Sequence, residues 1–153
     1  MKFSEFKYER PNLETVKQDL EAQLLIIGKT DDVQKEIKAV YEVFKINDAV
    51  DTQMTLSSIR HSIDTTDAFY EEERNFFDEN SPHLQQYNHQ FLDQLLNSKN
   101  RVELEKEFGS LMFIRADLAK KTFKPEIIPD LQKENRLSTQ YDKLIASAQI
   151  KFK

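Results

Sequence analysis

The three histidines are the first residues to examine for metal or acid–base chemistry, because the chain contains no cysteine. They are His61, His83 and His89. Zinc-dependent hydrolysis on a helix uses two histidines four residues apart with a glutamate between them. His83 and His89 are six residues apart and point to different sides of a helix. No glutamate stands three residues before any histidine, so the Glu-x-x-His unit of di-iron bundles is also absent. The spacing therefore predicts no metal ligand and no cofactor site in this chain.

Serine chemistry is the next alternative, because three serines lie within four residues of His61. Acyl transfer needs a nucleophile, a base and oxyanion donors that converge on one point, and residues along a single helix do not readily provide this. The sequence has neither a Gly-x-Ser-x-Gly turn nor a glycine-rich phosphate loop, and it contains two glycines in all. We therefore predict that the chain contains no catalytic residue.

One polar group remains to be explained. It consists of Arg60, His61, Asp64 and Asp67. Arg60 and Asp64 are four residues apart and can form an ion pair along a helix. Two interpretations stay open. In the first, Asp64 caps the next helix and Arg60 braces the turn between helices, since aspartate is favoured at helix N-termini. In the second, the four residues form a face that contacts another domain or a substrate channel.

Helices must position these residues, and the apolar spacing indicates helices along most of the chain. A first helix is expected over residues 13–27, where apolar residues recur at three- and four-residue steps. Asn12 is placed to cap its start, and Gly28 can adopt the left-handed conformation that ends it. A second pattern covers residues 33–63 and is either broken at residues 47–48 or continuous through them.

A third helical pattern starts at residues 64–67, where an Asx or Thr cap precedes an acidic residue. Residues 81–82, a serine followed by a proline, are expected to restart the helix, since proline is tolerated at the first helical position. Aromatic residues at helical spacing predict a buried face, made by Phe69, Tyr70, Phe76 and Phe77. Nearby acidic residues are expected on a solvated face, namely Glu71, Glu72, Glu73, Asp78 and Glu79.

Two further helices complete the expected fold. One starts near residue 100, with Gly109 as a kink, and the last opens at Pro125 or nearer to residue 128. The fold class is therefore expected to be all-α, a multi-helix bundle of long antiparallel helices over residues 1–148. Residues 149–153 alternate polar and apolar side chains, and we expect them to begin a β-strand that leads into a further domain.

The composition fits a compact soluble domain and argues against two classes of partner. Of 153 residues, 39% are hydrophobic and 32% are charged, as in globular proteins. The net charge of −5 argues against nucleic acid, which needs a basic face. No stretch approaches the roughly 20 apolar residues of a membrane span, and the N-terminus lacks the apolar region of a signal peptide. We therefore expect a cytoplasmic protein that binds neither nucleic acid nor membrane.

Several segments resemble one enzyme family. They are SSIRHSIDTTDAFY at residues 57–70, FFDENSP at 76–82, TFKPEII at 122–128, DLQ at 130–132 and LIASAQI at 144–150. In order and approximate spacing they are similar to the N-terminal helical region of oligoendopeptidase F, a zinc peptidase of the thimet-oligopeptidase type. The signature of that family, His-Glu-x-x-His, is absent from this chain.

The resemblance implies a non-catalytic N-terminal domain. Members of the family are cytosolic enzymes that cleave short peptides inside a channel between helical lobes, with zinc and its ligands in the C-terminal part. On this basis the chain forms part of the channel wall or a lid, and its partners are the missing C-terminal catalytic domain and, in the full-length enzyme, short peptides. Zinc is expected in the full-length enzyme, and this chain alone is expected to be inactive.

An independent helical interaction module is the alternative function. It explains the missing chemistry equally well, because a remaining apolar face can bind a partner helix. It does not explain why the resemblance to one enzyme family extends along the chain. Under the first hypothesis, we also expect the fragment to self-associate through Ile150 and Phe152, since an unpaired strand edge invites pairing.

Overall fold

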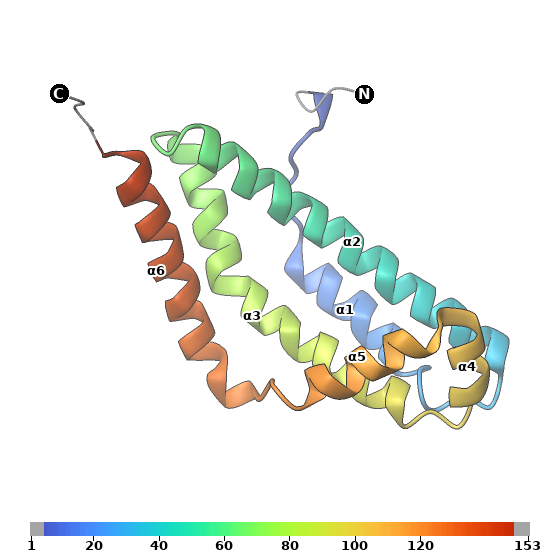
Figure 1. The fold of residues 1–153 in the computed structure, drawn as a ribbon. Coiled ribbons are helices and arrows are strands. Elements are labelled where there is room, and N and C mark those ends of the chain that lie inside the picture. Colours follow the sequence, from blue (N-terminus) through green and yellow to red (C-terminus); the bar gives the residue numbers. More distant parts are fainter. Residues whose placement is uncertain (1–4, 149–153) are drawn as a thin grey trace.

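Helices account for most of residues 5–148, the part of the chain that this computed structural model describes (Figure 1). Within these residues the elements are α1 (Leu13–Leu24), α2 (Val33–Ile63), α3 (Ala68–Leu96), α4 (Arg101–Phe108), α5 (Ser110–Lys120), the 3-10 helix η2 (Pro125–Ile127) and α6 (Ile128–Ala146). The all-α class is confirmed. The strand expected at residues 149–153 lies outside the described residues. None of the helices within residues 5–148 combines the length and the apolar character needed to cross a bilayer.

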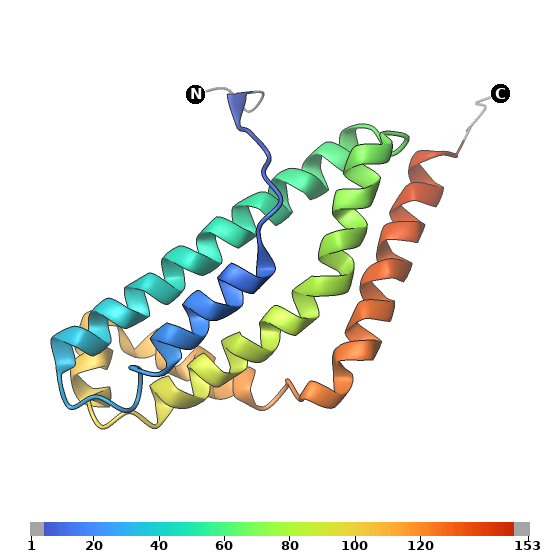
Figure 2. The ribbon, with the colours of Figure 1, turned by 180° about the vertical axis from the view of Figure 1, so that it is seen from behind.

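Helix α3 is the centre of the bundle. It packs against α1, α2, α5 and α6. The chain turns back after α2, so α3 runs antiparallel to it, and α6 returns antiparallel along the other side of α3 (Figures 1 and 2). The expected bundle of long antiparallel helices is thus present, with α3 as the element that the others share.

Local sequence signals account for several of the helix ends. The side chain of Asn12 caps α1, as expected. Helix α2 continues through residues 47–48 without a break, and Pro125 opens η2 so that α6 itself begins at Ile128. Gly109 has a φ of +82° and separates α4 from α5, so the expected kink is a complete break.

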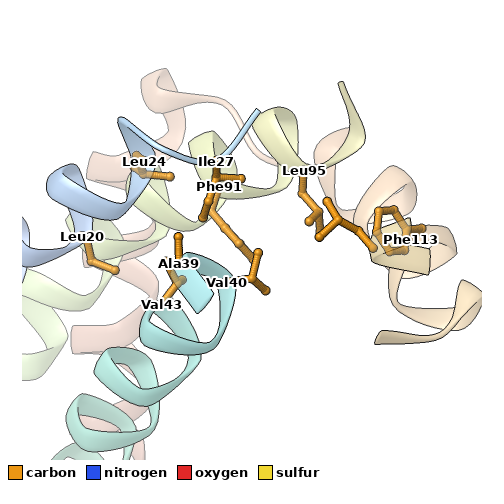
Figure 3. Packing of buried hydrophobic residues seen from close by; sticks show 10 residues of the cluster. Leu20, Leu24, Ile27, Ala39, Val40, Val43, Phe91, Leu95 and Phe113 are labelled. Carbon is orange, nitrogen blue, oxygen red and sulfur yellow. The ribbon is translucent and has the colours of Figure 1, made fainter. Parts of the chain in front are cut away.

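The apolar core fills the part of the bundle where α1, α2 and α3 meet the short helices α4 and α5 (Figure 3). Its buried members are Leu20, Leu24, Ile27, Ala39, Val40, Val43, Phe91, Leu95, Leu104 and Phe113. Glu36, one turn before Val40, is fully buried. Its carboxylate accepts hydrogen bonds from the backbone N–H of Gly28 at 2.7 Å and from Asn100 Nδ2 at 2.6 Å. These bonds satisfy the buried carboxyl oxygens and join the α1–α2 loop to the α3–α4 loop.

Two expectations about the surface of α3 were wrong. Phe77 is buried, but Phe69 is more than half exposed, so the aromatic residues do not form one core face. Glu73 and Asp78 are buried, although the acidic residues were expected on a solvated face. Their burial is tolerated because Arg10 pairs with Glu73, and Thr139 donates a hydrogen bond to Asp78.

The expected restart at Ser81 and Pro82 was also wrong, because α3 is continuous from Ala68 to Leu96. A proline inside a helix has no N–H to donate to the carbonyl four residues earlier, which here belongs to Asp78. That carbonyl accepts a hydrogen bond from Asn135 Nδ2 of α6 at 3.1 Å instead. A side chain from the neighbouring helix therefore replaces the missing backbone donor.

Helix α6 is held to α3 by several such polar contacts. Thr139 Oγ1 donates to Asp78 Oδ2 at 2.6 Å. Gln132 Nε2 donates to the backbone carbonyl of Glu79 at 2.7 Å. At the far end of the interface, Lys143 forms an ion pair with Glu71. The contact between these two helices therefore depends strongly on hydrogen bonds and charge pairs.

Replacing Pro82 should make the bond from Asn135 redundant. We expect Asn135→Ala to lower the free energy of unfolding by about 1 kcal/mol in the wild-type chain, the net value of one hydrogen bond. In a Pro82→Ala background the new N–H of residue 82 can bond to the Asp78 carbonyl. The loss of unfolding free energy caused by Asn135→Ala should then fall to about 0.2–0.4 kcal/mol. Urea unfolding followed by circular dichroism measures all four proteins of the cycle.

Thr139→Ala is the matched control. It removes a bond to the Asp78 side chain rather than to its backbone, so its cost should be the same with proline or alanine at position 82. An equal cost of Asn135→Ala in the two backgrounds would contradict the interpretation.

Candidate functional site

A groove between α2 and α6, with α3 as its floor, is one of several concave surfaces in the described residues. It consists of two adjoining hollows of about 500 Å³ and 370 Å³ that share Ser58 and Arg74. We call it the α2–α6 groove. The larger hollow is bordered mainly by polar side chains, among them Asn47, Asp51, Thr55, Gln85, Asn88 and Asn135. Apolar side chains line it as well, namely Val50, Met54, Ile59, Phe77 and Leu84, so the surface of the hollow is mixed in character.

Arg74 lies where the two hollows meet, and its guanidinium is occupied by contacts within the protein. Nη1 donates to Ser58 Oγ at 2.7 Å, and Nε lies 3.0 Å from Thr139 Oγ1. The same Nε lies 3.1 Å from the Asp78 carboxylate. Arg74 thus joins α2, α3 and α6 at one point, which makes it a structural residue of the groove.

His61 is the one member of the sequence-predicted polar group that borders the groove. Its side chain lines the smaller hollow, together with Ser62 and Asp142. The residue is only 4% exposed, and its Nε2 atom has no hydrogen-bond partner among residues 5–148. The hydrogen bond and the charge of Lys143 lower the pKa of the nearby Glu71 carboxyl, and His61 contributes to the same lowering.

Asp64 and Asp67 shape the turn between α2 and α3. Asp67, rather than Asp64, is the N-cap of α3, and it accepts hydrogen bonds from the backbone N–H groups of Phe69 and Tyr70. Asp64 accepts from both the backbone N–H and the hydroxyl of Thr66 within the turn. These bonds lower the pKa of Asp64.

Arg60 connects this turn to the N-terminal segment. Its Nη1 donates to the Tyr70 hydroxyl at 2.5 Å, and its Nη2 donates to the carbonyl of Phe6. The structure therefore does not bring the four residues together on one face. A role in contacting another domain or a channel stays a prediction for Arg60, His61, Asp64 and Asp67.

An ion-pair cluster that the sequence did not reveal anchors the N-terminal segment to α3. The Arg10 guanidinium approaches both carboxylate oxygens of Glu73, with Nε 2.9 Å from Oε2, and it also pairs with Glu72 at 2.8 Å. The Tyr8 hydroxyl donates to Glu73 as well. We call Tyr8, Arg10 and Glu73 the N-terminal clasp. Because 63 residues separate Arg10 from Glu73, no local spacing could have indicated this contact.

The charges of the N-terminal clasp shift its pKa values. The hydrogen bond from Arg10 holds the pKa of Glu73 below its usual range, and burial opposes this only in part. Burial and the adjacent Glu73 raise the pKa of Tyr8 above its usual range. Glu73 is therefore ionised and satisfied at neutral pH, as a structural carboxylate should be.

The described residues do not fit a zinc ion. Within residues 5–148 no group of three or more histidine, cysteine, aspartate or glutamate side chains converges as metal ligands. His83 Nε2 lies 3.1 Å from Gln132 Nε2, and the His89 ring lies against Phe123. Neither histidine approaches a second ligand of the kind that zinc requires.

Comparisons with known proteins give a consistent result. The model of the peptidase M3 N-terminal domain family matches residues 3–123. A crystal structure of a protein from Bacillus anthracis str. Ames, provisionally assigned as oligoendopeptidase F, is 40% identical over the whole chain, with a TM-score of 0.95. A structure of PZ peptidase A with an inhibitor is 38% identical over 99% of the chain, again with a TM-score of 0.95. The chain spans only 28% and 27% of the lengths of these two proteins. No curated protein sequence matches it.

The ionised state of Glu73 should make stability depend on pH. The pKa of Glu73 is lower in the folded state than in the unfolded state, where it is about 4.3. The carboxylate therefore stabilises the fold at pH values above about 4.3, and this stabilisation is lost as the pH falls through the folded-state pKa. Glu73→Gln should lower the free energy of unfolding by about 1–3 kcal/mol at pH 7, since Arg10 and Tyr8 lose a charged partner. The difference from wild type should shrink as the pH is lowered from 5 to 3.

Urea unfolding at successive pH values tests this expectation. Glu14→Gln is the control, because Glu14 is exposed and its ion pair is with Lys17, three residues along the same helix. It should change stability by less than about 0.5 kcal/mol at every pH. If the free energies of unfolding of wild type and Glu73→Gln differ by the same amount from pH 7 to pH 3, the carboxylate charge is unimportant.

Proposed function

The chain belongs to the peptidase M3 N-terminal domain family, and we propose that it forms one wall or a lid of the substrate channel of an oligoendopeptidase F-like zinc peptidase. The observation that carries this proposal is the match of the whole chain, at 40% identity, to 28% of a much longer oligoendopeptidase F-type protein. A segment that occupies so small a share of such a protein, and lacks its zinc-binding signature, is expected to contribute shape rather than chemistry.

The α2–α6 groove is the surface that we assign to the channel. It is concave, it lies between the C-terminal half of α2 and α6, and its mixture of polar and apolar side chains suits both the backbone and the side chains of a peptide. Of the polar group predicted from sequence, His61 is the residue that borders this surface. We assign Asp64 and Asp67 to the α2–α3 turn next to this surface, and Arg60 to the bracing of the end of α2 against α3 and the N-terminal segment.

The remaining parts of the proposal concern the protein beyond this chain. The catalytic residues, the zinc ion and its ligands belong to the C-terminal part. The substrates are short peptides, and the protein acts in the cytoplasm. The N-terminal domain limits which peptides reach the catalytic centre, so its variants should alter selectivity by peptide length rather than the chemical step.

Peptide hydrolysis by the full-length protein and by the 153-residue chain tests the proposal. We expect the full-length protein to cleave a quenched fluorescent peptide in a chelator-sensitive manner. The isolated chain should neither cleave the peptide nor bind zinc with micromolar affinity in calorimetry. The proposal would be overturned if the isolated chain hydrolysed the peptide, or if the full-length protein did not.

A bulky substitution in the groove tests the wall itself. Asn88 is exposed and lines the larger hollow, so Asn88→Trp should narrow the channel. In the full-length protein we expect kcat/KM to fall about tenfold for a long peptide, equivalent to about 1.4 kcal/mol, and much less for a short one. Lys38→Trp, at an exposed position of α2 outside the groove, is the control and should have no such effect. Equal effects on both peptides would argue against a channel-facing groove.

A further inference from the structure

Helix α6 has its polar and apolar faces reversed relative to an ordinary surface helix. Asn135, Thr139 and Lys143 recur every four residues and face α3, to which each of them is bonded. Helical spacing turns large apolar side chains away from this row, at Leu137, Tyr141, Leu144 and Ile145. Tyr141 and Ile145 lie at the edge of this apolar face and also border the smaller hollow of the α2–α6 groove. A helix at the edge of a bundle normally turns its apolar stripe toward the core. We call these four residues the outer stripe of α6.

The outer stripe is uncovered in the described part of the chain. Its four side chains are 54–66% exposed. Helix α6 packs mainly against α3 and the preceding η2, and it lies at the edge of the molecule in both views (Figures 1 and 2). Four large apolar residues on one helical face form a contiguous surface of the kind that marks a protein contact rather than scattered single exposures.

Helix α6 also lies outside the part of the chain that the family model covers. The match to the peptidase M3 N-terminal domain ends at residue 123, and α6 begins at Ile128. The solved relatives nevertheless match this chain over 99–100% of its length, so they contain an equivalent of α6. In those relatives the matched segment is less than a third of a much longer chain.

We infer that α6 is a bridge between two domains, and that its outer stripe packs into the apolar core of the C-terminal part of the same protein. This inference rests on the proposed function, which supplies that C-terminal part. The polar face fixes α6 to the N-terminal bundle through Asp78 and Glu71, and the apolar face belongs to the next domain. Each face of α6 thus contacts a different domain. The boundary between the two domains falls before α6 rather than after residue 148.

The C-terminal part is favoured over a second copy of this chain as the occupant. The solved relatives match the chain through α6 and continue well beyond it, so in them the equivalent of α6 leads into further chain. The relatives carry more than two thirds of their length outside the matched segment, which provides a covalently attached partner at high effective concentration.

Cysteine protection tests the inference, because the chain has no cysteine of its own. Leu144→Cys places one thiol in the outer stripe. The rate of its reaction with N-ethylmaleimide is measured by mass spectrometry of the corresponding peptide, in the 153-residue chain and in the full-length protein. We expect rapid labelling in the chain and labelling at least about tenfold slower in the full-length protein.

Val102→Cys is the matched control. Val102 is 62% exposed, close to the exposure of the outer stripe, and lies on α4 at the far end of the bundle (Figures 1 and 2). Its labelling rate should be the same in both proteins within about twofold. Circular dichroism establishes that each variant retains the helix content of its parent, so that slow labelling reports burial and not misfolding.

The outcomes separate this inference from the proposed function. Equal labelling of Leu144→Cys in both proteins, in a full-length protein that hydrolyses peptides, overturns the inference and leaves the proposed function intact. Protection in a full-length protein without peptidase activity supports the bridge but contradicts the proposed function. Protection that appears in the 153-residue chain as its concentration rises, with a dimer in light scattering, identifies a second copy as the occupant and overturns the inference.

Discussion

The position of α6 depends on the oxygen atoms of Asp78. Its backbone carbonyl lacks an intrahelical donor because Pro82 has no N–H, and its buried carboxylate needs partners because burial removes water. Asn135 and Thr139 of α6 satisfy one oxygen each, and Arg74 satisfies the carboxylate from within α3. Leaving such groups without partners is costly, so the contact specifies one register of α6 on α3.

This kind of contact explains how α6 can serve two neighbours. Hydrogen bonds fix a helix in orientation without using its large apolar residues, so the outer stripe stays exposed, with Leu137 and Leu144 outside the groove and Tyr141 and Ile145 at its border. The same contact also forms part of the α2–α6 groove. Arg74 of α3 lies at its floor, and Thr139 of α6 lies on its side. The shape of the groove and the presentation of the outer stripe therefore depend on a single interface.

The sequence predicted those features that local spacing determines. The all-α class, the cap at Asn12, and the start of the last helix near residue 128 follow from periodicity and from residues within one turn of each other. The cap of α3 was predicted in the right turn but at Asp64, whereas the structure places it at Asp67. The family was recognisable from short matching segments, and the comparisons confirm it.

What could not be predicted depends on residues far apart in the chain. The burial of Glu73 and Asp78 requires partners 63 and 61 residues away, and the continuity of α3 through Pro82 requires a donor from α6. The exposure of Phe69 has the same origin, since only the packed bundle decides which side of α3 is covered. For the candidate site, sequence identified His61 but grouped it with three residues that support a turn instead.

The N-terminal clasp has a consequence for the order in which the protein is made on the ribosome. Arg10 leaves the ribosome 63 residues before Glu73, an interval on the order of several seconds at ordinary elongation rates. When Glu73 emerges, its counter-charge is therefore already available. Asp78 differs, because Arg74 provides its counter-charge from the same helix, but the hydroxyl donor Thr139 follows it by 61 residues, so one carboxylate oxygen has no α6 donor until that helix has been synthesised. The contacts of Glu73 can therefore form as soon as that part of α3 has been made, because Arg10 is already present. The groove forms later, because it needs Thr139 and the rest of α6.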